Sequence, residues 1–135
     1  MAEQHPRGLL DTSVVIDLDS IDPELLPVES AISALSMAEL AAGPHASADT
    51  VERALRQDRL QRAEVLFDPL PFDADAARAY GLVYAAVIAA GRRARGPRAV
   101  DLLIAATAVA NGIPLYTRNA DDVRFLDGLV EVVEV

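Results

Sequence analysis

Short apolar runs alternate with longer amphipathic segments along the chain. Four runs of apolar residues bounded by turn-forming residues predict β-strands at residues 8–10, 31–35, 113–117 and 129–135. Apolar residues at helical spacing predict α-helices at residues 48–66, 73–90 and 98–111. Strands that alternate with helices are typical of a parallel sheet with helices on both faces. We therefore expect a three-layer α/β/α fold, formed by one domain over residues 1–135.

Three segments allow a more specific prediction. The segment 66–72 contains Pro69 and Pro71, so it is expected to be a short edge strand or an extended connector. Helix 73–90 is expected to pack on the core through apolar residues at helical spacing, which are Ala77, Tyr80, Tyr84, Val87 and Ile88. Helix 98–111 is almost entirely apolar, which indicates that it is buried.

The composition excludes several classes of site. No apolar run approaches the roughly 20 residues of a membrane span, and the N-terminal segment lacks the apolar core of a signal peptide, so we expect a cytoplasmic protein without a membrane partner. The absence of cysteine excludes disulfides, thiolate nucleophiles and Cys-ligated zinc. His5 and His45 each lie beside a proline in loop-like sequence, which is a poor arrangement for a zinc site.

The charge is unevenly distributed. A formal net charge of −9 argues weakly against nucleic acid as a partner, because polyanions repel. All 12 basic residues are arginine, however, and four of them lie between residues 92 and 98 in a segment, 76–100, without acidic residues. This segment is either a solvated loop or a local positive surface that holds an RNA backbone. The lack of lysine excludes lysine Schiff bases and phosphate-binding P-loops.

Several acidic residues follow predicted strands or begin helices. They are Asp11, Glu39, Asp101 and the pair Asp121 and Asp122. The carboxyl ends of parallel strands meet at one edge of a sheet, so these side chains are expected to share a pocket. Asp101 is expected to face the interior from the first turn of the apolar helix, where an unpaired charge costs several kcal/mol.

Each acid also has a purely structural interpretation. Asp11 is placed to cap a helix that begins at Thr12 or Ser13. Glu39 completes the Ser-x-x-Glu form of a capping box that begins at Ser36. Asp101 is placed to act as a first-turn charge on its helix. Turn formation alone would explain Asn119, Asp121 and Asp122.

A pocket of carboxylates without lysine either raises its own pKa values or recruits a divalent cation. Oxygen ligands without cysteine or histidine favour Mg²⁺, with Mn²⁺ as the other candidate. Because Mg²⁺ retains water and neutralises charge on phosphorus, phosphodiester hydrolysis is the natural reaction. We place the metal at Asp11 and Asp101, and no Ser–His–Asp arrangement competes as a covalent nucleophile.

Four segments together resemble the motifs of VapC-type PIN-domain toxins, in order and spacing. They are Leu-Leu-Asp-Thr-Ser at 9–13, Ser-Met-Ala-Glu-Leu at 36–40, Asp-Leu-Leu-Ile-Ala-Ala-Thr-Ala at 101–108 and Tyr-Thr-Arg-Asn at 116–119. The resemblance covers essentially the whole chain. It implies a PIN-like central parallel sheet, metal-dependent endoribonuclease activity in a type II toxin–antitoxin system, a homodimer, and a cognate VapB-type antitoxin that blocks the active site.

The resemblance also assigns residues. Asp11, Glu39 and Asp101 match the first three acids of the family, and Thr12 matches a hydroxyl position near the metal pocket. The fourth acid is assigned to Asp122 with Asn119 beside it. The aromatic residue that often follows this acid in the family is replaced here by valine, and Asp121 remains an alternative.

Two other functions are compatible with parts of this pattern. The first is a catalytically degenerate PIN-like binding module, which would lack one of the acids. The second is an aspartate-based phosphoryl-transfer domain of the receiver or haloacid dehalogenase type. Such domains normally need a lysine, and Ser13 lies where a dehalogenase-like motif would have its second aspartate.

Overall fold

The computed structural model describes residues 4–135, with the side chain of Pro97 left out. Its sheet contains the strands β1 (Arg7–Leu10), β2 (Glu29–Ile32), β3 (Leu115–Thr117) and β4 (Val132–Glu134). The strands are in the order β2-β1-β3-β4, and each neighbouring pair is parallel. This confirms the predicted parallel sheet, although β2 ends at Ile32 and the predicted strand extended to residue 35.

Five α-helices and several short 3-10 helices surround the sheet. The α-helices are α1 (Thr12–Ile16), α2 (Ala34–Ala42), α3 (Thr50–Leu66), α4 (Ala74–Ala89) and α5 (Pro97–Asn111). The 3-10 helices are η1 (Leu18–Ser20), η2 (Pro23–Leu25), η3 (Gly43–Ala46), η4 (Ala120–Asp122) and η5 (Arg124–Leu126). In the residues described, no helix is both long and apolar enough to cross a bilayer.

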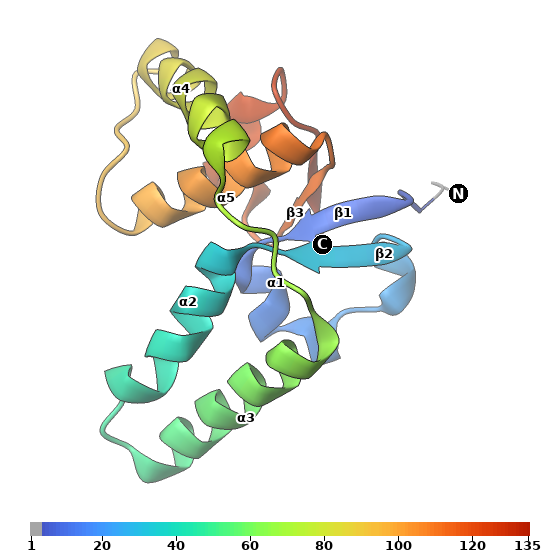
Figure 1. Ribbon diagram of the computed structural model, residues 1–135, viewed down its shortest axis with the longest axis vertical. Coiled ribbons are helices and arrows are strands. Elements are labelled where there is room, and N and C mark those ends of the chain that lie inside the picture. The colour runs from blue at the N-terminus through green and yellow to red at the C-terminus, as the bar shows by residue number, and fades with distance from the viewer. Residues whose placement is uncertain (1–3) are drawn as a thin grey trace.

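Alternating strand residues build a core on each face of the sheet. Leu9 is buried in one cluster with residues of α4 and α5, such as Val83 and Ile104. The next residue, Leu10, is buried in a second cluster with residues of α1 and α3. Successive side chains of a strand point to opposite faces, so both faces of β1 are covered. This arrangement gives the predicted three layers, which can be followed in Figure 1.

The start of α2 differs from the prediction. Ser33 is its N-cap and accepts a hydrogen bond from the Ser36 backbone N–H at 3.1 Å. Ser36 is buried inside the helix, so the predicted capping box between Ser36 and Glu39 was wrong. Glu39 therefore lies one turn further into the helix than a capping acid would, and its helix-capping interpretation no longer applies.

Two further predictions about helices were wrong. Asp101 is the fifth residue of α5, which places it in the second turn, and its side chain is exposed at the helix surface rather than facing the interior. In α4 the buried residues are Ala76, Ala79, Val83 and Val87, whereas Tyr84 and Ile88 are exposed. The segment after α3 forms a single bridge between Leu70 and Ser33, so it is a connector rather than a strand.

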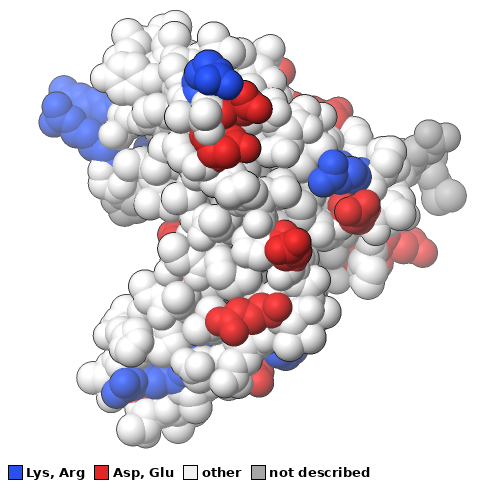
Figure 2. Space-filling model, in the orientation of Figure 1, with Lys and Arg blue, Asp and Glu red and all other residues white. Residues whose placement is uncertain are grey.

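The helices form two arms on the sheet. Figure 1 shows α2 and α3 as one arm and α4 and α5 as the other. In Figure 2 the surface between the arms is hollowed into a notch, and acidic atoms are visible at its inner end. The notch lies beyond the carboxyl ends of the strands, which is where open parallel sheets bind ligands.

Candidate active site

Asp11 connects the sheet to the first helix. Its backbone N–H donates to the Tyr116 carbonyl at 2.9 Å, which continues the pairing of β1 with β3. Its Oδ1 accepts hydrogen bonds from the Ser13 hydroxyl and from the Val14 N–H, the latter at 3.3 Å. Asp11 is thus the N-cap of α1. Within residues 4–135, Oδ2 takes no hydrogen bond, so this oxygen is available to a ligand.

Glu39 is held by a hydroxyl from another element. The Thr12 Oγ1 donates to Glu39 Oε1 at 2.6 Å and lies 2.9 Å from Ser36 Oγ. Thr12 is the first residue of α1 and Glu39 lies in α2, so this hydrogen bond joins two helices. The Thr12 hydroxyl therefore orients the Glu39 carboxylate. The family resemblance expected a hydroxyl near the metal pocket at this position.

The predicted aspartates converge from three elements. Asp11, Asp101, Asn119 and Asp122 line one cavity of about 60 Å³. Thr12 and Glu39 line a neighbouring cavity of about 400 Å³. The carboxylate of Glu39 is nevertheless close enough to Asp101 to raise its pKa. The fold thus gathers all six predicted site residues at one end of the sheet.

The electrostatics of Asp101 reflect this convergence. The pKa of Asp101 is raised from 3.8 to about 6, first by partial desolvation of its carboxyl group and then by repulsion from the carboxylates of Asp11, Glu39 and Asp122. Arg98 acts in the opposite direction. Asp101 is exposed as a residue, so the desolvation comes from the surrounding walls rather than from burial in the core. Four carboxylates are therefore close enough to affect one another.

The structure distinguishes between the two candidates for the fourth acid. Asp122 lines the cavity with Asp11 and Asp101. The side chain of Asp121 is 98% exposed and lies 3.7 Å from Arg124. Both aspartates belong to η4, but only Asp122 faces the other acids.

Two of the four arginines predicted near the site contact other groups of the protein. Arg98 Nη2 is 3.8 Å from Asp122 Oδ1. The Arg92 guanidinium is 4.8 Å from the centre of the Phe125 ring and donates to the Asp122 carbonyl at 3.3 Å, so Arg92 ties the loop to η4. Arg93 and Arg95 are exposed. Figure 2 shows basic side chains at the edge of the upper arm, where this loop lies.

Two hydroxyl residues of the site were not assigned from the sequence. Ser13 donates to the Asp11 carboxylate and accepts from the Arg118 N–H at 3.1 Å, which links α1 to the end of β3. Thr117 lines the same cavity, and its Oγ1 accepts from the Asn119 N–H at 3.1 Å. Both residues lie inside the quoted motifs, next to assigned residues, which was the only signal for them.

The donor set fits a hard divalent cation. The grouped side chains offer carboxylate oxygens, and the raised pKa of Asp101 shows repulsion that a cation would relieve. In the part of the chain that the structure describes, no three such side chains yet lie close enough together to hold an ion. Binding therefore requires side-chain rotations toward the centre of the pocket.

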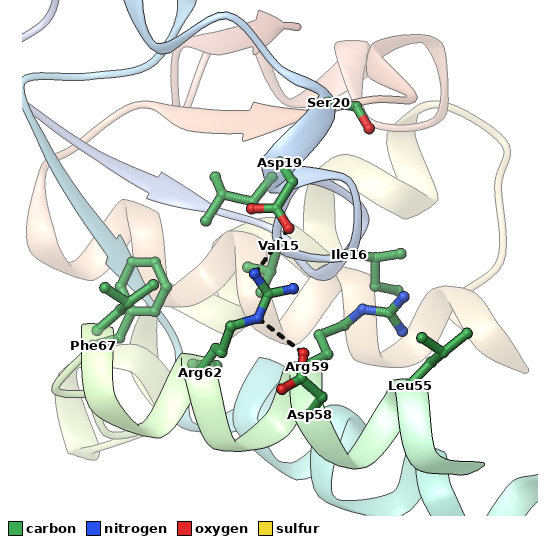
Figure 3. A pocket seen from close by; sticks show the side chains of 12 residues that line it. Val15, Ile16, Asp19, Ser20, Leu55, Asp58, Arg59, Arg62 and Phe67 are labelled. Carbon is green, nitrogen blue, oxygen red and sulfur yellow. Dashed lines mark hydrogen bonds and ion pairs between the residues drawn. The ribbon is translucent and has the colours of Figure 1, made fainter. Parts of the chain in front are cut away.

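A groove lined by both apolar and charged side chains lies on the neighbouring arm, with a volume of about 270 Å³. It runs between α1 and α3, and its lining includes Ile16, Leu55, Leu66 and Phe67 (Figure 3). Arg62 crosses it through ion pairs with residues 19 and 58, at 2.9 and 3.2 Å. Ile16 also lines the cavity that contains Glu39, so the groove leads toward the acidic site.

Comparison with known proteins identifies the family of this chain. The PIN domain family model matches residues 8–127. Ribonuclease VapC5 from Mycobacterium tuberculosis is 38% identical over the full length of both chains. Ribonuclease VapC4 from the same organism is 33% identical, over 96% of this chain and 97% of that protein.

A solved structure extends the similarity to the whole fold. The crystal structure of VapBC-5, a member of the VapBC family of toxin–antitoxin systems from Mycobacterium tuberculosis, matches with a TM-score of 0.85 and 37% identity. The match covers 96% of this chain and 99% of that one. The chain therefore belongs to the PIN-domain family, among the VapC-type ribonucleases.

Proposed function

We propose that this protein is a divalent-metal-dependent endoribonuclease and the toxin of a type II toxin–antitoxin pair. The observation that carries the proposal is the convergence of Asp11, Glu39, Asp101 and Asp122 at the carboxyl ends of the strands. Partial desolvation of Asp101 and repulsion from the other three carboxylates raise its pKa to about 6. The relatives with the same fold are named ribonucleases. All four acids are present, which argues against the degenerate binding module.

In this proposal Asp11 and Asp101 hold the cation, preferably Mg²⁺, with Asp122 and Glu39 beside them. A bound Mg²⁺ supplies an acidified water and neutralises charge at the phosphodiester. The protein positions the ligands: Ser13 and the Val14 N–H fix one oxygen of Asp11 and leave the other free. Thr12 orients Glu39. Asn119 and Asp122 line the same cavity.

The test is cleavage of a single-stranded RNA by the purified protein. We expect cleavage with Mg²⁺ or Mn²⁺ and loss of cleavage in excess EDTA, because no histidine or lysine is present in the pocket to act as a general base without metal. Restoring Mg²⁺ should restore cleavage. Full activity in EDTA would contradict the proposal.

The similarity to this family also supports a proposal for the partner protein. The structures that match include toxin–antitoxin complexes, and we propose that a VapB-type antitoxin binds this chain. Its apolar side chains would occupy the groove at Leu55, Leu66 and Phe67. An Arg or Lys of the antitoxin would reach the carboxylates, since an acidic pocket is best blocked by a cation. A complex whose acidic pocket stays open would contradict this arrangement.

The homodimer implied by the family resemblance is also a proposal. Light scattering of the isolated toxin is the direct test, and it should give twice the mass of one chain. A mass equal to a single chain at all concentrations would contradict it.

A further inference from the structure

The cavity beside Glu39 contains basic residues that the proposed chemistry does not use. It lies between α1, α2 and α3, and its lining includes Thr12, Ile16, Glu39, Arg56 and Arg59. Thr12 and Ile16 are four residues apart in α1, or about 6 Å along the helix axis. The cavity therefore begins beside Glu39 and extends by about one helical turn along α1.

The two arginines of this cavity differ in their partners. Arg56 is fully engaged, because its Nε lies 2.9 Å from Glu52 Oε1 and its Nη1 donates to the Gly43 carbonyl at 2.9 Å. Arg59 takes part in no ion pair or side-chain hydrogen bond within residues 4–135, and it is half-buried. Figure 3 shows Arg59 extending from α3 toward Ile16, and both residues line the cavity as well as the groove.

An unpaired arginine in the wall of a cavity is unusual in a chain with a net charge of −9, where carboxylates are abundant. The planar guanidinium matches the oxygens of a phosphate group with two parallel hydrogen bonds. The other basic residues of the notch, at 92–98, lie on the opposite arm. An RNA strand has phosphates on both sides of the bond that is cleaved. Cations on both arms, with the carboxylates between them, are placed to bind phosphates on each side of that bond.

We infer that Arg59 forms a phosphate-binding subsite for the RNA strand, on the Glu39 side of the cleaved bond. The inference rests on the proposed ribonuclease function and adds the path that the substrate takes. The strand would pass from the loop between α4 and α5, across the acids, and into the cavity between α2 and α3. The exposed Ile16 side chain offers an apolar contact to a sugar or base on the way.

The test measures binding of a labelled single-stranded oligoribonucleotide by fluorescence anisotropy over a range of salt concentrations. An Asp101→Asn background in Mg²⁺ prevents cleavage during the measurement. Adding Arg59→Ala should weaken binding roughly tenfold, as expected for one lost charge-assisted contact. It should also reduce the slope of log affinity against log salt by about 0.7, the value for one phosphate contact on a single strand.

Arg53→Ala is the matched control. Arg53 lies in the same helix, is exposed, and lines none of the cavities described above. Arg53→Ala removes the same charge and should leave the affinity for the oligoribonucleotide, and the slope of log affinity against log salt, nearly unchanged. Arg59→Lys keeps the charge and should recover most of the slope, which separates phosphate binding from a packing defect.

The outcomes are distinct. Equal effects of Arg59→Ala and Arg53→Ala, with a wild-type protein that cleaves RNA, overturn the subsite and leave the ribonuclease function standing. A wild-type protein that neither binds nor cleaves RNA overturns both. If Arg59→Ala weakens only antitoxin binding, the cavity belongs to the partner and the inference is wrong.

Discussion

Hydroxyl groups position the carboxylates of the site. Ser13 binds one oxygen of Asp11, and Thr12 binds Glu39 from a different helix. A carboxylate that accepts such a hydrogen bond loses rotational freedom before any ligand arrives. Ser13 and Thr12 therefore orient Asp11 and Glu39, whereas Asp101 and Asp122 lie near Arg98. We expect these two aspartates to move most when a cation binds.

Removing the charge of Asp101 should affect activity and stability in different directions. Asp101→Asn keeps the shape of the side chain and removes its charge, so we expect RNA cleavage to be lost. The metal-free protein should be as stable as wild type or more stable, by up to about 1 kcal/mol, because repulsion from three acids is relieved and solvent screens the gain at this exposed residue. Urea unfolding in EDTA and a cleavage assay in Mg²⁺ measure the two quantities. A mutant that is less stable but fully active would refute the assignment.

The raised pKa of Asp101 predicts that the stability of the protein depends on pH. The folded pKa of Asp101 is about 6 and its ordinary value is 3.8, so the folded protein holds more protons between these values. Linkage then requires the contribution of Asp101 to the free energy of unfolding to fall as pH rises from about 4 to 6. Asp101→Asn should remove this decline, and the difference between mutant and wild type should vanish below pH 4. A difference that does not change with pH would assign the stability effect to packing.

At the scale of elements, the sheet depends on close contact between β1 and β3. A Cβ at Gly8 would lie 2.8 Å from Tyr116 Cδ1 and 3.1 Å from Pro27 Cγ. Tyr116 is buried and cannot swing into solvent. The first residue of the first apolar run is therefore small because the Tyr116 side chain of the adjacent strand fills its space.

Gly8→Ala should destabilise the protein by about 1–3 kcal/mol, the range for overpacking a filled site. The control is Gly81→Ala in α4, where an added Cβ meets nothing within 4 Å. That change should be neutral or stabilising by up to about 1 kcal/mol, because alanine favours the helix. Thermal or urea unfolding of both variants measures the difference. Equal stability changes would show that the contact with Tyr116 carries no energy.

Across the whole molecule, the acidic site proposed for RNA cleavage and the groove proposed for the antitoxin occupy different places. The acidic cavity contains residues at the carboxyl ends of the strands, and the groove between α1 and α3 lies on the arm that carries α3 (Figures 1 and 3). A partner seated in the groove would block the site without any change in the catalytic residues. Toxin activity and antitoxin binding should therefore be separable by mutation.

Leu66→Glu tests this separation. Leu66 lines the groove and is 65% exposed, so the substitution should weaken antitoxin binding by at least tenfold while RNA cleavage stays near wild type. Val65→Glu is the control, since Val65 is the preceding residue, is 86% exposed and does not line the groove. Titration calorimetry with the cognate antitoxin and a cleavage assay provide the measurements. Identical affinities of the two variants would place the partner elsewhere.

Much of this architecture was determined by the sequence alone. Alternating apolar runs and helical periodicity are local signals, and they located the strands and helices to within a few residues. Parallel strands share one carboxyl edge, so the order of the acids along the chain was enough to predict that Asp11, Glu39 and Asp101 would meet.

Only the tertiary structure decided the remaining features. Ser33 rather than Ser36 caps α2, because the connector at Leu70 pairs with this end of β2 and fixes where the helix begins. The choice of Asp122 over Asp121 depends on how η4 turns against the sheet. The position of Arg59 beside the acidic site depends on how α3 packs against α1. These features arise from contacts between segments far apart in sequence, and local periodicity contains no information about such contacts.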